Sequence, residues 1–470
     1  MHKVAVIGAG VIGGFVAREL ARYNLDVIIL EKGVDVCSGA SRANSGIVHG
    51  GFDAKTGSLK AKFNVLGNQM MSAVCEELGV KYINNGSLVL SYDDDNSALV
   101  ELKNRGEDNG VNDIKILNRE ETLEIEPNIS DEVKWSLYAP TGGIVCPYNL
   151  TIASVGNAMD NGATLLTNFD VEKIDDGFEI YSKDGRSVKV DYIINCAGAG
   201  AEKIANLLGD YSFKIGYRKG EYMLLDNSVG NFAKHTLFTL PTKAGKGVLI
   251  SPTVDGNIIV GPTSIEQDGY DVSVRPTAFE EIKENATKMC NNLPLGNVIT
   301  SFAGVRAYSD RHDFIIEESA INGLYNVVGI ESPGLTSAPA IGKYVAERVA
   351  NKFNLKLKTN FNPYRKSSDY FKHLSIEEKN KIIKERPEYG KIICRCESVT
   401  LGEILDAMRT NPKATTVDGI KLRTRAGMGR CQSGFCQPSV LELIMAEYGV
   451  GFDEVSKNGK GSQIIVGGEK

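Results

Sequence analysis

Two groups of residues in this chain have the types and the spacing that redox chemistry needs. Near the start, Gly8, Gly10 and Gly13 form a Gly-x-Gly-x-x-Gly pattern directly after a short apolar segment. Near the end lie two close pairs of cysteines that thirty-four residues separate: Cys394 and Cys396, then Cys431 and Cys436. Such glycines let a phosphate approach the backbone, and thiolates bind metal ions or iron–sulfur clusters. A chain with both patterns suggests an enzyme that oxidises a substrate and passes the electrons on singly.

The glycine pattern lies where an expected strand, residues 3–8, becomes an expected helix, residues 11–23. Gly8 permits the tight turn, Gly10 lets a pyrophosphate approach the backbone, and Gly13 lets the helix pack closely on the sheet. The start of the helix also offers free N–H groups and the positive end of its dipole to the phosphates. We therefore predict a dinucleotide site at this turn.

An acidic residue ends the next expected strand. Glu31 closes residues 26–31, and its carboxylate can accept hydrogen bonds from the ribose hydroxyls of an adenosine. The same carboxylate would repel a 2′-phosphate, so NADP is not expected. Two later segments, INCAGAGA at 194–201 and GLYNVVGIESPGLTSAPAIG at 323–342, suit further close approaches of backbone to nucleotide. They favour FAD over NAD, which the glycine pattern alone does not separate.

The order of the expected elements indicates an α/β fold with two interleaved layers. Apolar strands at the glycine turn, at 190–200 and at 323–329 are typical of a buried parallel sheet. Short strands separated by turns indicate a more antiparallel layer: residues 86–92, 220–226, 247–252 and 257–262. Asp255-Gly256 is a hairpin signal between the last two strands. We predict a Rossmann-type FAD-binding domain interleaved with a mixed or antiparallel substrate domain, followed by a small, mostly helical C-terminal domain.

The chain divides into four predicted regions. They are an oxidoreductase region at 1–355, a polar and basic linker at 356–388, the cysteine domain at 389–452 and a tail at 453–470. Within the first region, the FAD-binding part is expected at about 1–85, 145–215 and 320–355, and the substrate part at about 86–144 and 216–319. Ser375 is a candidate helix cap in the linker.

The composition is ordinary for a globular chain of two or three domains. Of 470 residues, 42% are hydrophobic and 24% are charged, and the formal net charge is −6. This acidic balance argues against a general nucleic-acid binder, which needs a basic surface. No apolar run reaches the roughly twenty residues that span a bilayer, and no secretion signal precedes the first strand. We therefore expect a cytoplasmic protein, membrane-associated only through a partner.

Several separated segments together resemble the D-amino-acid-oxidase-type FAD oxidoreductases. They are GAGVIGG at 8–14, Glu31, SRANSGIVHGG at 41–51, INCAGAG at 194–200, GKGVLISPTVDGNIIVGPT at 245–263 and GIESPGLTSAPAIG at 329–342. Within this superfamily, the resemblance is strongest to FAD-dependent glycerol-3-phosphate dehydrogenases and oxidases, with L-2-hydroxyglutarate oxidases as near relatives. It covers about residues 1–355. It implies bound FAD and oxidation of a small anionic secondary alcohol, with sn-glycerol 3-phosphate, oxidised to dihydroxyacetone phosphate, as the favoured substrate.

The resemblance also assigns four side chains to the reacting centre. His49, which glycines flank, would lie beside the flavin and act as general base on the substrate hydroxyl. Arg306 would grip the substrate anion, Lys246 would lie over flavin and substrate, and Ser332 would bond the same anion. Without the resemblance, the same residues suit plainer roles: a structural loop histidine, two surface cations and the first residue of a turn.

The residues expected to contact FAD come from the glycine turn and the matching segments. They are Gly8, Gly10, Gly13, Glu31, Ser41, Asn44, Ser45, Ala197, Gly198, Gly334, Leu335 and Thr336. A helix expected to start near Leu335 could face the pyrimidine ring of the flavin, where its positive end would stabilise the reduced form.

Four thiolates from two loops suit either a [2Fe–2S] cluster or structural zinc. Cys394-x-Cys396 is tighter than the usual zinc spacing. The segment resembles the bacterioferritin-associated-ferredoxin-like [2Fe–2S] domain, in the version that ends the large subunit of anaerobic glycerol-3-phosphate dehydrogenases. Other members have Cys-x2-Cys in the second pair, so Cys431-x4-Cys436 departs from the broader pattern. Basic residues nearby could offset cluster charge, dock a partner or form a solvated face: Lys421, Arg423, Arg425 and Arg430.

These patterns predict a dehydrogenase with an internal electron exit. Flavin accepts a hydride as two electrons, whereas a [2Fe–2S] cluster carries one at a time. The cluster therefore suits transfer to an electron-accepting partner, either a flavoprotein or a membrane-associated redox subunit, and an oligomer is compatible with this. One alternative is an L-2-hydroxyglutarate or other 2-hydroxy-acid dehydrogenase, whose substrate Arg306 would serve equally. Another is a non-catalytic redox sensor or iron-handling module, in which His49 and Lys246 would be dispensable.

Overall fold

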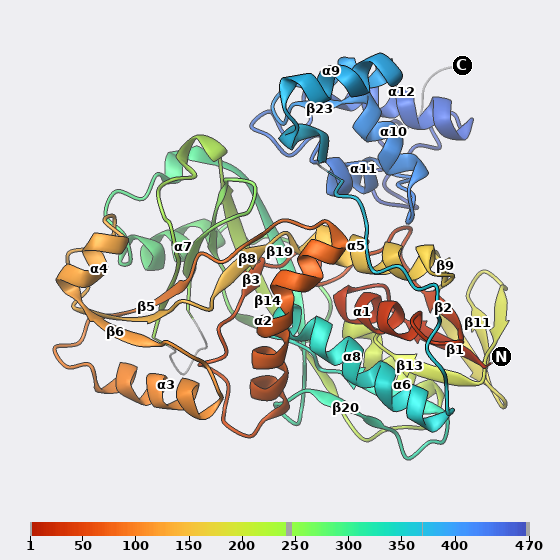
Figure 1. The fold of residues 1–470 in the computed structure, drawn as a ribbon, viewed down its shortest axis with the longest axis horizontal. Helices are drawn as coiled ribbons and strands as arrows, with labels where there is room; N and C mark the ends of the chain where they lie inside the picture. Colours follow the sequence, from red (N-terminus) through yellow and green to blue (C-terminus); the bar gives the residue numbers. More distant parts are fainter. Residues whose placement is uncertain (1, 241–246, 369, 467–470) are drawn as a thin grey trace.

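The computed structural model describes residues 2–240, 247–368 and 370–466. Two sheets lie side by side in a broad body, and a small helical lobe sits on top of it (Figure 1). The predicted fold class is confirmed: a parallel layer and a largely antiparallel layer alternate along the chain before the helical C-terminal part. None of the described helices is long and apolar enough to cross a membrane.

The first sheet has six strands in the order β20-β21-β13-β1-β2-β9, and its pairs are parallel except β20–β21. Its strands are β1 (Lys3–Ile7), β2 (Asp26–Leu30), β9 (Thr164–Leu166), β13 (Tyr192–Asn195), β20 (Ile315–Glu318) and β21 (Leu324–Val328). The helices on one face are α1 (Val11–Leu20), α2 (Leu59–Leu78), α5 (Pro147–Asp160) and α8 (Gly334–Lys352). On the other face lie β10 (Val171–Asp175), β11 (Glu179–Ser182), β12 (Ser187–Lys189) and α6 (Ala201–Leu207).

The side chains of β1 point alternately to the two covered faces of the sheet, which explains why the strand is apolar along its length. Val4 and Val6 pack into the core under α1, α5 and α8, whereas Ala5 and Ile7 pack into the core under β10 and β11. A parallel strand with both faces covered needs apolar residues at every position. The strands expected at the glycine turn are confirmed and end one residue early, and α1 ends at Leu20.

The second sheet has nine strands in the order β18-β14-β17-β16-β15-β5-β7-β6, and β19 also pairs with β14. Its strands are β5 (Ser87–Ser91), β6 (Lys115–Asn118), β7 (Trp135–Ala139), β14 (Ile215–Leu225), β15 (Thr236–Thr239), β16 (Leu249–Pro252), β17 (Ile258–Gly261), β18 (Ile265–Gln267) and β19 (Val298–Ser309). The helices of this half are α3 (Ser97–Asp108), α4 (Arg119–Ile125) and α7 (Ala278–Thr287). A small sheet of β3 (Ile47–Val48), β4 (Tyr82–Ile83) and β8 (Gly143–Val145) completes the body.

Two features of the second sheet bear on the predictions. The Asp255-Gly256 hairpin between β16 and β17 is confirmed, and Gly256 adopts the positive φ of 83° that the turn requires. The strand expected at 220–226 is part of the much longer β14, which pairs along its length with β19.

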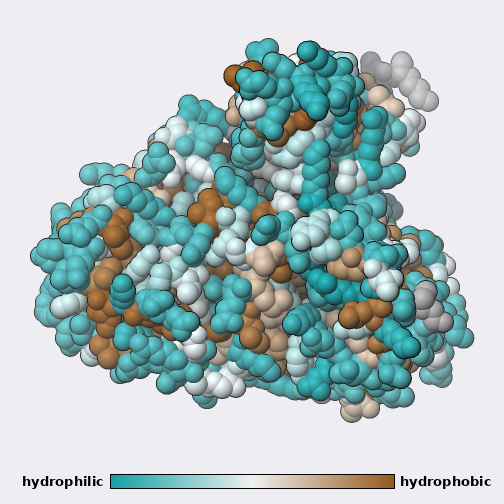
Figure 2. Space-filling view, viewed as in Figure 1, coloured by the Kyte–Doolittle hydropathy of each residue, from teal (hydrophilic) through white to brown (hydrophobic). Residues whose placement is uncertain are grey.

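The helical lobe builds its own apolar core around Ile404, Ile420 and Ile444. Its elements are α9 (Ile376–Glu385), β22 (Ile392–Cys394), β23 (Val399–Thr400), α10 (Leu401–Arg409), α11 (Val417–Thr424) and α12 (Gln437–Tyr448). The predicted cap of α9 is confirmed, because the Ser375 hydroxyl accepts from the Glu378 N–H in a reciprocal capping box. Figure 2 shows the lobe as a mostly polar projection above the body.

Candidate active site and cluster site

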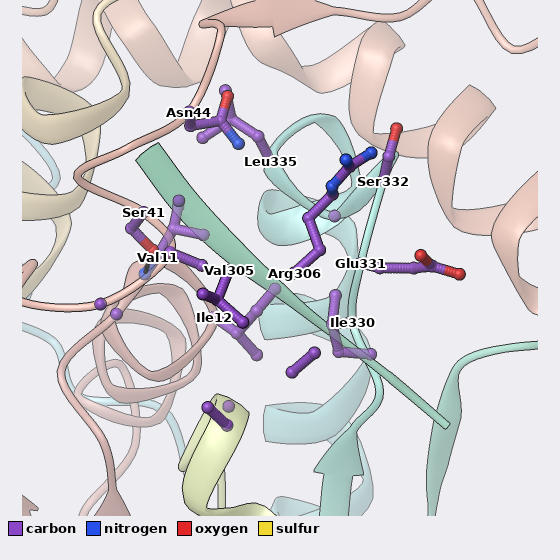
Figure 3. Close-up of a pocket in the computed structure, with 18 of the residues that line it drawn as sticks. Val11, Ile12, Ser41, Asn44, Val305, Arg306, Ile330, Glu331, Ser332 and Leu335 are labelled. Atoms are coloured by element: carbon purple, nitrogen blue, oxygen red, sulfur yellow. Dashed lines mark hydrogen bonds between the residues drawn. The ribbon is translucent and has the colours of Figure 1, made fainter. Parts of the chain in front are cut away.

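A cavity of about 950 Å³ is lined by the ends of the first sheet and by side chains of the second. Figure 3 shows part of its wall. Arg306 reaches from β19 to the loop that carries Glu331 and Ser332, while Ser41 and Asn44 lie on the opposite side. A cavity this large between a glycine turn and a polar pocket has room for a dinucleotide and a small substrate.

Most of the predicted site residues line this one cavity. They are Gly8, Gly10, Glu31, Ser41, Asn44, Ser45, His49, Ala197, Gly198, Arg306, Ser332, Gly334 and Leu335. Gly13 and Thr336 are not among the lining residues, but Gly13 packs closely on Gly8 and Thr336 bonds His49. Lys246 lies outside the described residues. The structure thus brings together residues from segments more than three hundred positions apart in sequence.

Close backbone contacts at the turn after β1 explain its glycines. Gly8 has a φ of +106°, and a Cβ there would lie 2.5 Å from the Cys196 carbonyl oxygen. A Cβ at Gly13 would lie 1.8 Å from the Gly8 carbonyl oxygen, so α1 could not keep this distance from β1. The turn therefore has the open backbone surface that a pyrophosphate needs.

Glu31 has a structural task that sequence reasoning missed. Its carboxylate accepts hydrogen bonds from the N–H groups of Ala9 and Gly33 and from the Ser38 hydroxyl, each at 2.8 Å. The side chain thus ties the glycine turn to the loop after β2. Because Glu31 also lines the cavity, this carboxylate both shapes the nucleotide site and faces it.

His49 follows β3 and is fixed through its backbone. Its N–H donates to Thr336 Oγ1 at 2.9 Å, and its carbonyl oxygen accepts from Asn68 Nδ2 at 3.1 Å. Its Nε2 lies 3.4 Å from Ser332 Oγ, and its ring stacks on Phe238. The predicted base and the predicted anion-binding serine are therefore neighbours. Thr336 serves this pair by holding the His49 backbone.

Arg306 presents an incompletely bonded guanidinium to the cavity. Its Nη2 donates to the Thr263 carbonyl oxygen at 3.2 Å, whereas its buried Nε has no hydrogen-bond partner among the described residues. The guanidinium lies over Gly220, where a Cβ would come within 3.1 Å of Nη2. A buried donor without a partner is costly, so this position suits the oxygen of an anionic ligand.

A charged group beside Ser332 escaped sequence analysis. Glu331 accepts from Lys60 Nζ at 2.7 Å and lies 3.6 Å from Arg218 Nη1. Arg218 stands directly opposite Arg306 in the β14–β19 register, and both arginines line the cavity. Only the position of Glu331 next to Ser332 could have hinted at this group, since Lys60 and Arg218 belong to no motif.

The four late cysteines form two pairs. The sulfurs of Cys396 and Cys431 lie 3.5 Å apart, and the thiol of Cys436 is hydrogen-bonded to the sulfur of Cys394. Each pair joins one cysteine of the first loop to one of the second. Two such pairs suit a [2Fe–2S] cluster, in which each iron binds two cysteine sulfurs. A Cβ at Gly429 would lie 2.3 Å from the Cys396 Cβ, so this glycine lets the loops meet.

The surroundings of Cys394 favour a thiolate. The hydrogen bond with Cys436 and the backbone N–H groups of Gly427 and Glu397 lower its pKa to about 6, although burial opposes them. Burial of Cys37, one of the five scattered cysteines, instead raises the pKa of its thiol to about 12. Two backbone N–H groups thus support a thiolate at Cys394, and four thiols in two pairs fit a [2Fe–2S] cluster.

Three of the four basic residues near the cysteines pair with carboxylates, although one of them, Arg430, remains exposed to solvent. Arg423 makes a bidentate ion pair with Asp35 at 2.7 and 2.8 Å. Arg425 pairs with Asp255 at 2.6 Å, and Arg430 pairs with Asp226 at 2.8 Å. All three carboxylates belong to the body, so these arginines dock the lobe onto it.

Comparisons with known proteins agree with this geometry. Residues 3–348 match the family model of FAD dependent oxidoreductases, and residues 392–446 match that of BFD-like [2Fe-2S] binding domains. A glycerol 3-phosphate dehydrogenase of Caloramator mitchellensis is 48% identical over 100% of this chain and 99% of its own. The FAD-bound L-alpha-glycerophosphate oxidase of Mycoplasma pneumoniae superposes with a TM-score of 0.73 at 32% identity, over 78% of this chain and 99% of that one.

The predicted alternative family is more distant. A mitochondrial L-2-hydroxyglutarate dehydrogenase of Bos taurus is 26% identical over 75% of this chain and 89% of its own. The FAD model spans most of the body, and the cluster model spans the lobe. The chain therefore belongs to the FAD-dependent oxidoreductase family, with FAD as its cofactor and a BFD-like domain for a [2Fe–2S] cluster at its C-terminal end.

Proposed function

We propose that this protein is a dehydrogenase that oxidises sn-glycerol 3-phosphate to dihydroxyacetone phosphate and releases the electrons through its cluster. The observation that carries the proposal is the half-buried Arg306, whose buried Nε has no hydrogen-bond partner within the described part of the chain, in the same cavity as the His49–Ser332 pair. A cation for the phosphate and a base for the hydroxyl are the two groups that this substrate needs. The similar dehydrogenase from Caloramator mitchellensis supports the same substrate.

His49 would take the proton of the substrate hydroxyl as the carbon–hydrogen bond breaks. FAD supplies the hydride acceptor, and the cluster supplies a one-electron carrier. The hydrogen bonds to Thr336 and Asn68 fix the His49 backbone, while Ser332 and Phe238 hold its ring. A base held in this way needs little reorganisation when the proton moves.

Arg306 would bind the phosphate through its Nε, which the described residues leave without a partner. Arg218 stands opposite it in the β14–β19 register and pairs with Glu266 and Glu331. Lys60 also pairs with Glu331, so these four charges balance one another and the charge that would meet the phosphate is that of Arg306. Lys246, outside the described residues, stays a proposed contact to the substrate. The electrons would then leave to an electron-accepting protein, a flavoprotein or a membrane-associated redox subunit.

Anaerobic absorbance spectra during titration with glycerol 3-phosphate test this function. We expect the flavin bands to bleach first and the longer-wavelength cluster bands to follow. A parallel titration with L-2-hydroxyglutarate should leave both unchanged. If only L-2-hydroxyglutarate bleaches the flavin, the proposed substrate is wrong but the proposed mechanism still applies. If neither compound bleaches it, a sensor or iron-handling role is favoured.

A further inference from the structure

The lobe is bound to the body by arginine–carboxylate pairs. Two of the arginines are buried, with exposed fractions of 5% for Arg423 and 12% for Arg425, whereas Arg430 is 67% exposed. A fourth pair runs the other way, from Arg42 of the body to Asp418 of the lobe at 2.5 Å. In Figure 1, α11 of the lobe lies directly above α5 of the body, and these helices pack together. Buried pairs of this kind fix an orientation, because separating them leaves charges without partners.

Arg425 is the centre of this interface. Its guanidinium donates to Asp255 at 2.6 Å, to Asn257 at 3.1 Å and to the Tyr148 hydroxyl at 3.3 Å. It also donates at 2.7 Å to Glu397, the residue after Cys396. One side chain thus connects the β16–β17 hairpin and the first turn of α5 with a loop that carries two cluster ligands.

Tyr148 and Met428 form a further contact between the body and a cluster loop. The Tyr148 hydroxyl lies 3.4 Å from Met428 Sδ. Met428 begins the turn that leads to Cys431, and the next residue, Gly429, packs on Cys396. From the body, one phenol therefore reaches the loop that holds the Cys396–Cys431 sulfur pair.

On its other side, Tyr148 lies one residue behind the cavity wall. Its neighbour Pro147 packs on Gly46, where a Cβ would lie 3.4 Å from the Pro147 Cδ. Gly46 stands between Ser45 and Ile47, which both line the cavity. A continuous chain of contacts thus runs from the cavity wall through Gly46, Pro147, Tyr148 and Met428 to the cluster loop.

We propose that Tyr148 and Met428, held by Arg425, form the internal electron passage from flavin to cluster, and that the lobe stays docked during turnover. This proposal depends on the proposed function in one respect only, namely that the flavin is reduced during turnover. The reduced flavin gives up two electrons and one proton. The cluster accepts the electrons one at a time and hands each to an external one-electron acceptor, and the proton leaves to solvent. Tyr148, Met428 and Arg425 act as positioning residues in these steps.

The test follows the two cofactors separately after the flavin is reduced by a light pulse with a deazaflavin, which needs no substrate. The variants are Tyr148→Phe, Met428→Leu, Arg425→Lys and Arg425→Gln. Arg409→Gln is the matched control. Among the described residues, Arg409 forms an ion pair only with Glu447, which belongs to the lobe itself. We expect electron transfer to slow by about tenfold or more in Arg425→Gln, since small displacements of reacting groups are costly. Arg425→Lys should recover part of the rate.

Each outcome decides the proposal. Flavin reduction by glycerol 3-phosphate should keep the wild-type rate in every variant, which separates this passage from the substrate site. Wild-type transfer in both Arg425→Gln and Tyr148→Phe would overturn the passage. Equal slowing in Arg409→Gln would also overturn it, because the effect would then come from the lobe as a whole. Failure of glycerol 3-phosphate to reduce the flavin would refute the substrate but leave the light-pulse result intact.

Discussion

At the scale of single residues, His49 offers the sharpest test of the chemistry. Replacing it with glutamine keeps a hydrogen-bonding side chain but removes the base, so flavin reduction by glycerol 3-phosphate should slow by about a hundredfold or more. FAD content should stay unchanged, because the His49 backbone keeps its bonds to Thr336 and Asn68. His2→Gln, at a half-exposed position next to Asp191, is the control. If the His49→Gln enzyme kept its activity, His49 could not be the general base.

Arg306 tests how the anion is held. In Arg306→Lys the charge remains but the planar fork is lost, together with the Nε that has no partner in the described structure. We expect KM for glycerol 3-phosphate to rise by about tenfold to a hundredfold, with a smaller change in kcat. Arg311→Lys is the matched control, since Arg311 forms an exposed pair with Glu317. A lower kcat at constant KM would point to a role other than ground-state binding.

At the scale of elements, the distance between α1 and β1 decides whether the dinucleotide fits. Gly13→Ala places a Cβ 1.8 Å from the Gly8 carbonyl oxygen, so the helix must move away from the turn. The purified variant should contain much less FAD than the wild type, measured by flavin absorbance per protein. Gly296→Ala, outside the cavity lining and with open space around its Cβ, should keep its FAD. Equal FAD loss in both variants would mean general instability of the protein.

How far the sequence predicts the structure depends on how local each feature is. The strands and the helix at the glycine turn follow from a continuous apolar run and local turn chemistry, and they were confirmed. β14 was underestimated, because its length comes from pairing with β19, about eighty residues away in sequence. The Lys60–Glu331–Arg218 group is invisible for the same reason: each member belongs to a different element, and only the fold brings them together.

At the scale of the whole molecule, the loop after β2 connects FAD to the lobe. Ser38 and Ser41 line the cavity, whereas Asp35 and Arg42 of the same loop pair with Arg423 and Asp418. Removal of FAD should therefore loosen the lobe and speed proteolysis of the segment between α8 and α9. By reciprocity, Asp35→Asn should raise the dissociation constant for FAD by about fivefold or more. Asp176→Asn, on an exposed turn, is the control; unchanged FAD affinity in Asp35→Asn would show that the loop does not couple the two sites.

The exposed edge of the cluster site has a distinct character. Cys396 is exposed, and Phe435 and Ile392, close in sequence to Cys436 and Cys394, are 85% and 56% exposed. The exposed charges among residues 391–398 are basic, because Glu397 is buried against Arg425. An apolar and basic surface beside a one-electron centre favours an acceptor with an acidic face.

Small redox probes of opposite charge test this edge without knowledge of the natural acceptor. Arg395 lies between two ligands and is exposed, so Arg395→Glu should slow reoxidation of the reduced enzyme by ferricyanide, an anion. It should speed reoxidation by hexaammineruthenium(III), a cation, and both effects should shrink at high salt. Lys381→Glu, on α9 of the same lobe, carries the same charge change away from the ligand loops and should alter neither rate. If both variants behave alike, the electrons respond to the net charge of the lobe and do not leave at the Arg395 edge.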